Sequence, residues 1–109
     1  MTYEEIYDAL CETELPVTLN FWEGKPPGLP YIVYELPENN DLVADNINYA
    51  EIVRLDIGLY TKRKDIDTEH AVEEILTKHF GAFFKSSDWV QNDHVQETIY
   101  TTEVSINGE

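Results

Sequence analysis

Apolar positions recur along the chain with two different periods, and each period predicts a different kind of element. At the start they lie three or four residues apart, which predicts a helix over residues 2–12. Thr2 followed by Glu5 fits a capping box that would begin this helix, and Pro16 lies just beyond its end. The stripe expected to face the core consists of Tyr3, Ile6, Tyr7 and Leu10.

Four further segments are rich in β-branched and aromatic residues, which predicts strands. Residues 17–22 and 31–36 are separated by a loop with three prolines and two glycines. Residues 49–60 alternate most clearly, and at ~3.4 Å per residue they would run roughly 40 Å, so part of this strand is expected to project beyond the core. We expect it to pair with the second long strand, residues 94–106.

A second helix is predicted between these long strands. It begins at Asp67 or Thr68 and ends at Phe80, because Gly81 is a helix stop. The residues expected to face inward are Val72, Ile75, Leu76 and Phe80. Residues 83–90 are ambiguous, with a short strand expected to begin at Trp89. The order α-β-β-β-α-β-β predicts a single α+β domain over residues 1–109, a mostly antiparallel sheet with two helices packed on one face.

Residues 37–46 are predicted to form a loop, which would be too long for a simple hairpin turn. It mixes apolar side chains with acidic ones, and an isolated domain gains little by exposing the apolar ones. The sequence therefore predicts a partner interface in this loop, consisting of Glu38, Asp41, Leu42, Val43 and Asp45. The alternative is that Leu42 and Val43 fold back onto their own sheet.

The net charge of the chain limits the kinds of partner that it can bind. The chain has 22 Asp and Glu against 7 Lys and Arg, a formal net charge of −15. It should repel both nucleic acid and anionic membranes, because binding to either needs cations on the protein. No stretch approaches the ~20 apolar residues that span a bilayer. The N-terminal residues are acidic where a signal peptide would be basic, so we expect no secretion by that route. Cys11 is the only cysteine, which fits a reducing compartment, and we expect synthesis in the cytoplasm.

The sequence contains no complete catalytic or metal-binding pattern. His70 with Glu73 or Glu74 has helical spacing for two metal ligands, but a catalytic metal normally needs three. Cys11 adjoins the first helical stripe without a recognisable His partner, and is interpreted as a small half-buried hydrophobe. We therefore expect a structural or interaction protein that is not an enzyme and has no cofactor or metal.

Several strand and turn segments resemble those of small tail-completion or tail-terminator proteins of long-tailed phages and prophages of Gram-positive bacteria. The segments are residues 29–34 (LPYIVY), 44–46 (ADN), 54–62 (RLDIGLYTK), 15–17 (LPV) and 60–65 (YTKRKD), together with both predicted helices. The resemblance thus covers nearly the whole chain, and it includes no catalytic signature.

The resemblance implies a virion structural protein that assembles as a ring, usually a hexamer, at the end of a non-contractile tail tube. Its partners would be other copies of itself, the tail tube protein and the head connector protein, at the head-tail junction of the virion. DNA would pass through the ring without specific binding. Three other classes stay open from the residues alone: an acidic inhibitor that mimics DNA, a secretion chaperone that binds an extended segment of one effector, and an enzyme that uses carboxylates alone.

Overall fold

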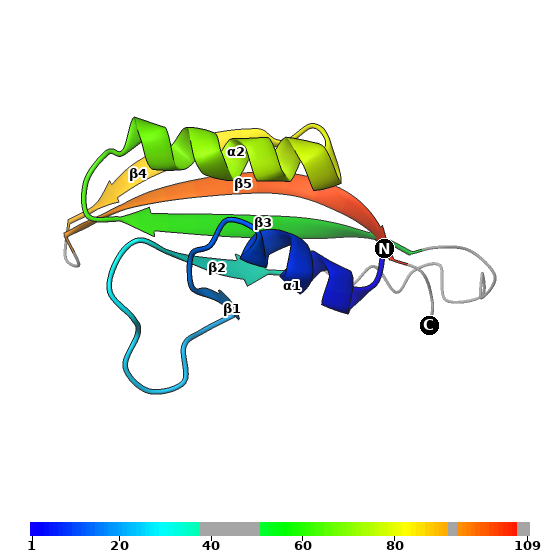
Figure 1. Cartoon of the computed structure of the whole chain (residues 1–109), viewed down its shortest axis with the longest axis horizontal. Coiled ribbons are helices and arrows are strands. Elements are labelled where there is room, and N and C mark those ends of the chain that lie inside the picture. The colour runs from blue at the N-terminus through cyan, green and yellow to red at the C-terminus, as the bar shows by residue number, and fades with distance from the viewer. Residues whose placement is uncertain (38–50, 92–93, 107–109) are drawn as a thin grey trace.

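Two helices lie on one face of a five-stranded sheet, and none of the described residues forms a helix on the other face (Figure 1). The computed structural model describes residues 1–37, 51–91 and 94–106. The fold is α+β, with the predicted element order. The elements are α1 (Tyr3–Cys11), β1 (Val17–Leu19), β2 (Tyr31–Glu35), β3 (Glu51–Thr61), α2 (Ile66–Phe80), β4 (Phe84–Val90) and β5 (Val95–Ile106).

The sheet has the order β1-β2-β3-β5-β4 and is mostly antiparallel, as the sequence predicts. The one parallel pair among the described strands is β1 with β2, aligned from Val17 opposite Ile32 to Leu19 opposite Tyr34. The loop over residues 20–30 leads the chain from the end of β1 back to the start of β2. That return makes the two strands run the same way.

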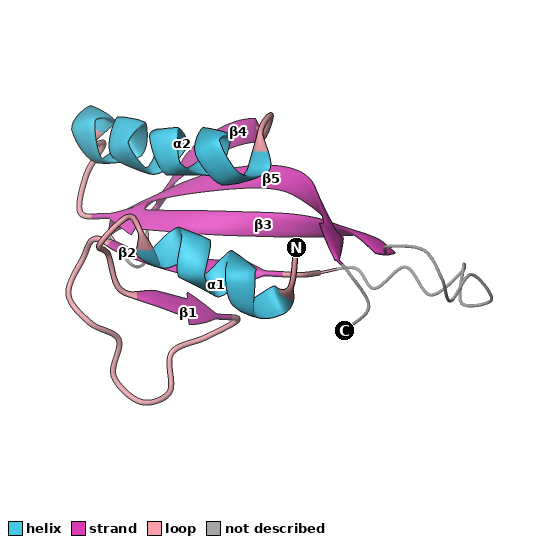
Figure 2. Ribbon diagram, turned by 45° about the vertical axis from the view of Figure 1, so that its right-hand side comes forward, coloured by secondary structure: helices cyan, strands magenta, loops and turns pink. Residues whose placement is uncertain are grey.

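The two long strands pair along their full length, as predicted, and Figure 2 shows them running side by side. Antiparallel pairing runs without a break from Glu51 opposite Ile106 to Thr61 opposite Gln96. Neither neighbour is as long: β2 stops at Asp56 of β3, and β4 stops at Thr101 of β5. The two long strands therefore continue past their neighbours as a two-stranded ribbon.

The prediction that part of the long strand projects beyond the core is wrong in one respect. The ribbon passes its neighbouring strands, but its helix-facing side chains Val53 and Val104 are 4% and 6% exposed. Met1 and Leu36 pack against the same core, and the Met1 amino group donates a hydrogen bond to the Ser105 carbonyl. Burial on this side explains why the strand stays regular to its end.

Both helices begin at capping residues. The capping box of α1 is confirmed: the Glu5 N–H donates to Thr2 Oγ1 over 3.1 Å, and the Thr2 N–H donates to Glu5 Oε1 over 2.7 Å. In α2 the cap is Asp65, whose carboxylate accepts from the Thr68 N–H over 3.1 Å. The helix therefore begins at Ile66, slightly earlier than predicted. It ends before Gly81, where φ is +79°.

The prediction for the buried face of α1 is wrong for its aromatic residues. Ile6 and Leu10 are fully buried, but Tyr3 and Tyr7 are 51% and 44% exposed. Cys11 is exposed as well, contrary to the half-buried position expected of it. A short helix at the side of a small core has a narrow buried stripe, and the flanking positions remain in solvent.

The core lies between the helices and the sheet and draws on every element except β4. In α2, Val72 and Leu76 are buried, while Ile75 and Phe80 are half-buried. The buried side chains of the core are Ile6, Leu10, Val17, Ile32, Tyr34, Val53, Leu55, Ile57, Leu59, Val72, Leu76, Tyr100, Val104 and Ile106.

The strand β4 begins at Phe84, five residues before the short strand expected from the sequence. Six of its seven residues are exposed, so the segment has no alternation of apolar and polar positions that a sequence pattern would reveal. Pairing with β5 alone makes it a strand.

We predict that Gly58→Ala destabilises the protein. Gly58 lies in β3 between two neighbouring strands, and a Cβ there would come within 3.1 Å of the Val33 carbonyl oxygen and 3.0 Å of the Tyr60 ring. The carbonyl belongs to a paired strand and cannot move without loosening the sheet. We expect a loss of about 1–3 kcal/mol in the free energy of unfolding, measured by urea denaturation.

Gly28→Ala is the control for this substitution. A Cβ at Gly28 meets no atom within 4 Å, so its effect should be small or slightly stabilising. If Gly58→Ala is as stable as the wild type, the position has room for a Cβ and the expected steric clash is wrong.

Candidate functional site

The predicted partner interface lies outside the described residues. Its members are Glu38, Asp41, Leu42, Val43 and Asp45, and the prediction stays a prediction. Three other regions of the described chain gather polar or exposed apolar side chains: a charged cluster under α2, a depression beside that helix, and the face of the sheet without helices.

The charged cluster joins α2 to β4 and β5. The Glu69 side chain is 1% exposed, and its two carboxylate oxygens lie 2.8 Å from Lys85 Nζ and 3.0 Å from Lys64 Nζ. Lys85 also lies 2.6 Å from Glu73, whose carboxylate accepts a hydrogen bond from the Tyr100 hydroxyl over 2.8 Å. Each member of the cluster thus has a partner of opposite charge or a hydrogen-bonding partner.

These contacts fix the charges of the cluster. Burial alone would raise the pKa of Glu69 and of Glu73, but the contacts with Lys85 and their other partners outweigh burial and hold both pKa values below the ordinary range. The two carboxylates raise the pKa of Lys85. Burial, followed by the bond to Glu73, raises the pKa of Tyr100. Groups held so firmly in one ionisation state are suited to anchoring a helix and poorly suited to proton transfer.

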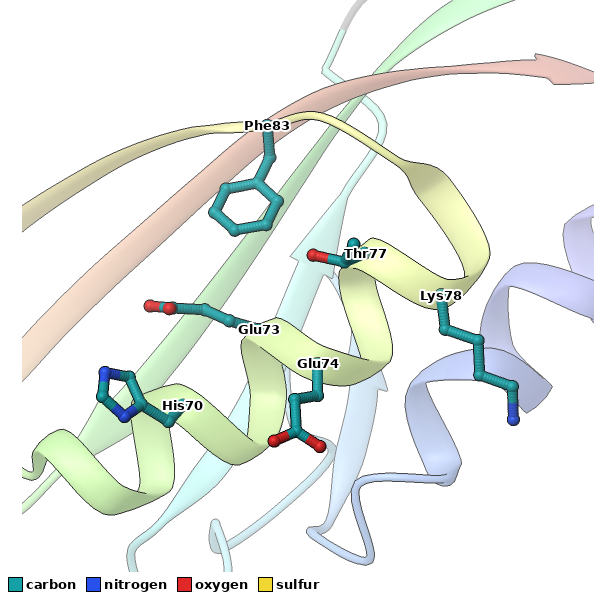
Figure 3. A pocket seen from close by; sticks show the side chains of 6 residues that line it. All are labelled: His70, Glu73, Glu74, Thr77, Lys78 and Phe83. Atoms are coloured by element: carbon teal, nitrogen blue, oxygen red, sulfur yellow. The ribbon is translucent and has the colours of Figure 1, made fainter.

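An open depression of about 660 Å³ lies beside α2 (Figure 3). It is lined by His70, Glu73, Glu74, Thr77, Lys78 and Phe83. The figure shows five of these side chains projecting from α2 and the Phe83 ring facing them from the segment that leads to β4. This is where the structure places the candidate metal ligands considered from the sequence.

The depression lacks the donor set of a metal centre. Glu73 is engaged by Lys85 and Tyr100, and Lys78 extends to Glu12 of α1 over 3.2 Å. The Glu12 carboxylate also lies 3.0 Å from His79, and the contacts with His79 and Lys78 lower the pKa of Glu12. Throughout the part of the chain that the structure describes, no group of three or more His, Cys, Asp and Glu side chains is arranged to hold a metal ion.

The helix-free face of the sheet is the third candidate site, and it is acidic. Register places on it the strand residues whose neighbours face the core. Among the described strand residues this face has five carboxylates and a single cation: Glu35, Asp56, Asp88, Glu97 and Glu103 against Arg54. Arg54 is paired with Asp56 through two contacts of 3.1 Å, which leaves four carboxylates outside that pair.

Aromatic side chains lie at one end of this face. The Trp22 and Tyr31 rings meet edge to face with centroids 5.5 Å apart, and the Tyr31 and Tyr60 rings are 5.4 Å apart. The Tyr60 hydroxyl donates to Glu97 over 2.6 Å, and burial together with this bond raises the pKa of Tyr60. The face therefore combines an aromatic patch, of the residue types enriched in protein-binding surfaces, with acidic groups, which are depleted in them.

Sequence analysis missed Glu69 as a buried residue, although a signal was present. Glu69, Val72 and Leu76 have the spacing of one helical face, so the carboxylate shares the stripe of two core residues. A Glu on that stripe requires cations within reach of its carboxylate, and only the tertiary structure shows that Lys64 and Lys85 supply them.

Within residues 1–37, 51–91 and 94–106, no helix has the length and apolar character needed to cross a membrane. No model of a known protein family matches the chain, and no curated protein matches it.

We predict that Glu69→Gln destabilises the fold in a pH-dependent way. The substitution removes the charge that Lys85 and Lys64 face, so we expect a loss of about 1.5–3 kcal/mol in the free energy of unfolding near neutral pH. A carboxyl group whose pKa falls on folding stabilises the fold above its ordinary pKa of 4.5 and loses that contribution as pH falls through the lowered value. The gap between wild type and variant should therefore close in acid, as urea denaturation across pH would show.

Glu74→Gln is the matched control, because Glu74 is an exposed carboxylate of the same helix. Its substitution should change stability by less than about 0.5 kcal/mol. Equal effects of the two substitutions, or a gap that does not depend on pH, would contradict the role given to the cluster.

Proposed function

We propose that this chain is a structural protein of a long-tailed phage that forms a ring at the end of the tail tube. The ring would terminate the tail, join it to the head connector, or do both, and it would be made in the host cytoplasm and lie in the virion. The resemblance of the sequence to tail-completion proteins gives the proposal its specific content. The observation that carries it in the structure is the acidic, helix-free sheet face.

Negative charge suits a protein that DNA must pass without binding. Six copies at −15 each would carry a formal charge of about −90, the hexamer being the usual ring of the family that the chain resembles. A surface of this sign repels phosphates, whereas bound cations would release counterions from DNA and hold it. The four carboxylates outside the Arg54–Asp56 pair provide such a surface on one face of each protomer.

The β3–β5 ribbon supports contact between protomers. Its helix-free side bears Ile52, which is 60% exposed although it lies in a regular strand. Since the ribbon extends past both neighbouring strands, this isoleucine lies beyond β2 and β4 and can reach another molecule. An exposed aliphatic side chain at such a place gains free energy when a neighbouring protomer covers it.

The two alternative binding functions would also use the acidic sheet face, but for a different partner. A DNA mimic would present its carboxylates to a basic enzyme, and a secretion chaperone would bind one extended segment. Both would act as monomers or dimers, so the size of the assembly separates them from a closed ring.

We expect assembly to strengthen with salt. Protomers of charge −15 repel one another, and the Debye length falls to ~10 Å at 0.1 M ionic strength, so moderate salt should favour larger species. Native mass spectrometry and sedimentation give the size of these species, and negative-stain images show whether they are closed rings. Only monomers or dimers at every ionic strength, or larger species at low salt than at moderate salt, would count against the proposal.

Ile52→Asp should weaken ring formation while leaving the protomer folded. The substitution places a charge where we propose that a neighbouring protomer packs, and Ile52 itself is exposed. The control is Ile66→Asp, a similarly exposed isoleucine, 49% exposed, in the first turn of α2, where an acidic residue is well tolerated. Sedimentation at moderate salt compares the two variants. Equal assembly by both would show that the ribbon makes no such contact.

A further inference from the structure

The outer edge of β4 is an unpaired strand edge seven residues long. β4 is the last strand of the sheet and pairs only with β5, from Phe84 opposite Thr101 to Val90 opposite Val95. The register has no bulge and the strand has no proline, the two devices that commonly block such an edge. Its outward N–H and C=O groups have no partner strand within the described chain and remain available for hydrogen bonds.

The opposite edge of the sheet, formed by β1, has much less backbone available for pairing with another strand. β1 has three residues, and the chain turns away at Asn20, where φ is +70°. The Phe21 N–H closes this turn by donating to the Leu19 carbonyl over 2.8 Å. Of the two edges, only β4 has the length to take another strand.

The side chains of β4 are exposed but do not protect its edge. Phe84 is 83% exposed and Trp89 is 48% exposed. A lysine in an edge strand usually deters pairing. Here the Lys85 ammonium is held on the helix-facing side by Glu69 and Glu73, at 2.8 and 2.6 Å, so it is not available to guard the edge.

Charge along this edge indicates the sign of the partner. Asp88 lies directly opposite Glu97 on the helix-free face, an arrangement of like charges that destabilises a sheet. Asp88 has no ion pair or hydrogen bond from its side chain to the rest of the described chain, and Glu97 accepts only from the neutral Tyr60 hydroxyl. A cation beside Asp88 would relieve the repulsion and would itself gain an ion pair.

We propose that the β4 edge binds an extended basic segment of a partner protein, which adds to the sheet as a sixth strand. Backbone hydrogen bonds would supply affinity, as in other cases of strand addition, and alternate side chains would supply specificity. On the helix-free face the segment would carry a cation beside Asp88 and apolar side chains beside Phe84 and Val90. This inference does not depend on ring formation.

A second copy of the chain does not fit this edge as well. Full-length antiparallel pairing of two β4 strands places Asp88 opposite Ser86 of the other copy, so it brings no cation to the acidic pair. The only cation of β4, Lys85, faces the other side of the sheet and is already engaged. Two chains of charge −15 also repel.

The test uses the full chain and a synthetic peptide that can place valine beside Phe84, serine beside Ser86, lysine beside Asp88 and valine beside Val90, with threonines at the positions between them. The comparison peptide has glutamate in place of the lysine. Hydrogen exchange is followed at the individual β4 amides. We expect the lysine peptide to protect alternate amides of β4, those whose N–H groups point outward, and the glutamate peptide to leave them unprotected. Absence of this protection would overturn the proposal. So would protection without any peptide that grows with protein concentration, because the occupant would then be a second copy.

Charge reversal provides the second arm of the test. Asp88→Lys should weaken binding of the lysine peptide at least about three-fold and create binding of the glutamate peptide. The variant should fold at least as stably as the wild type, because it replaces the like-charge pair with Glu97 by an opposite pair. Asp8→Lys makes the same change in net charge at an exposed position of α1. If Asp8→Lys shifts peptide binding as much as Asp88→Lys does, binding follows net charge alone and the proposed edge site is wrong.

Discussion

The antiparallel pairing of β3 with β5 is the interaction on which the rest of the fold depends. Eleven residues of β3 have partners in β5, and the alternation along both strands divides the sheet into a buried and an exposed face. Leu55, Ile57 and Tyr100 are fully buried on the helix side. β2 and β4 each add to one outer edge of this pair, and both helices cover its apolar side. A one-residue slip in its register would exchange the two faces.

Scarcity of cations shapes the electrostatics of the molecule. Four of its seven Lys and Arg side chains are engaged in ion pairs within the fold: Arg54, Lys64, Lys78 and Lys85. Two of them enclose Glu69, which allows a carboxylate to lie in the core stripe of α2. An ion pair cancels one charge of each sign, so these contacts leave the excess negative charge of the chain unchanged. The same distribution underlies the acidic sheet face and the unrelieved pair of Asp88 with Glu97.

The helix-free face and the β4 edge give the protomer two different ways to meet other molecules. The face presents side chains, with the aromatic patch of Trp22, Tyr31 and Tyr60 at one end and exposed Ile52 on the ribbon. The edge presents backbone groups, so it selects for an extended conformation of the partner as well as for its charge. Asp88 belongs to both the acidic face and the edge site. The proposed ring contact at Ile52 is nevertheless compatible with a sixth strand, because Ile52 lies on the ribbon beyond β4, whereas the sixth strand binds β4 itself.

The sequence by itself determined the element order, the fold class, the capping box at Thr2, the stop at Gly81 and the pairing of the two long strands. These features follow from local chemistry and from periodic burial, and both leave a pattern in consecutive residues. Only the tertiary structure decided the extent of β4, the exposure of Tyr3 and Tyr7, and the partners of Glu69. An edge strand has no buried face to mark it, and the contacts of Lys85 with Glu69 and of Tyr100 with Glu73 join residues far apart in the chain, so neither leaves a pattern in neighbouring positions. The open edge of β4 also depends on the tertiary structure, because the strand order, which cannot be read from the sequence, places this largely exposed strand at the edge of the sheet.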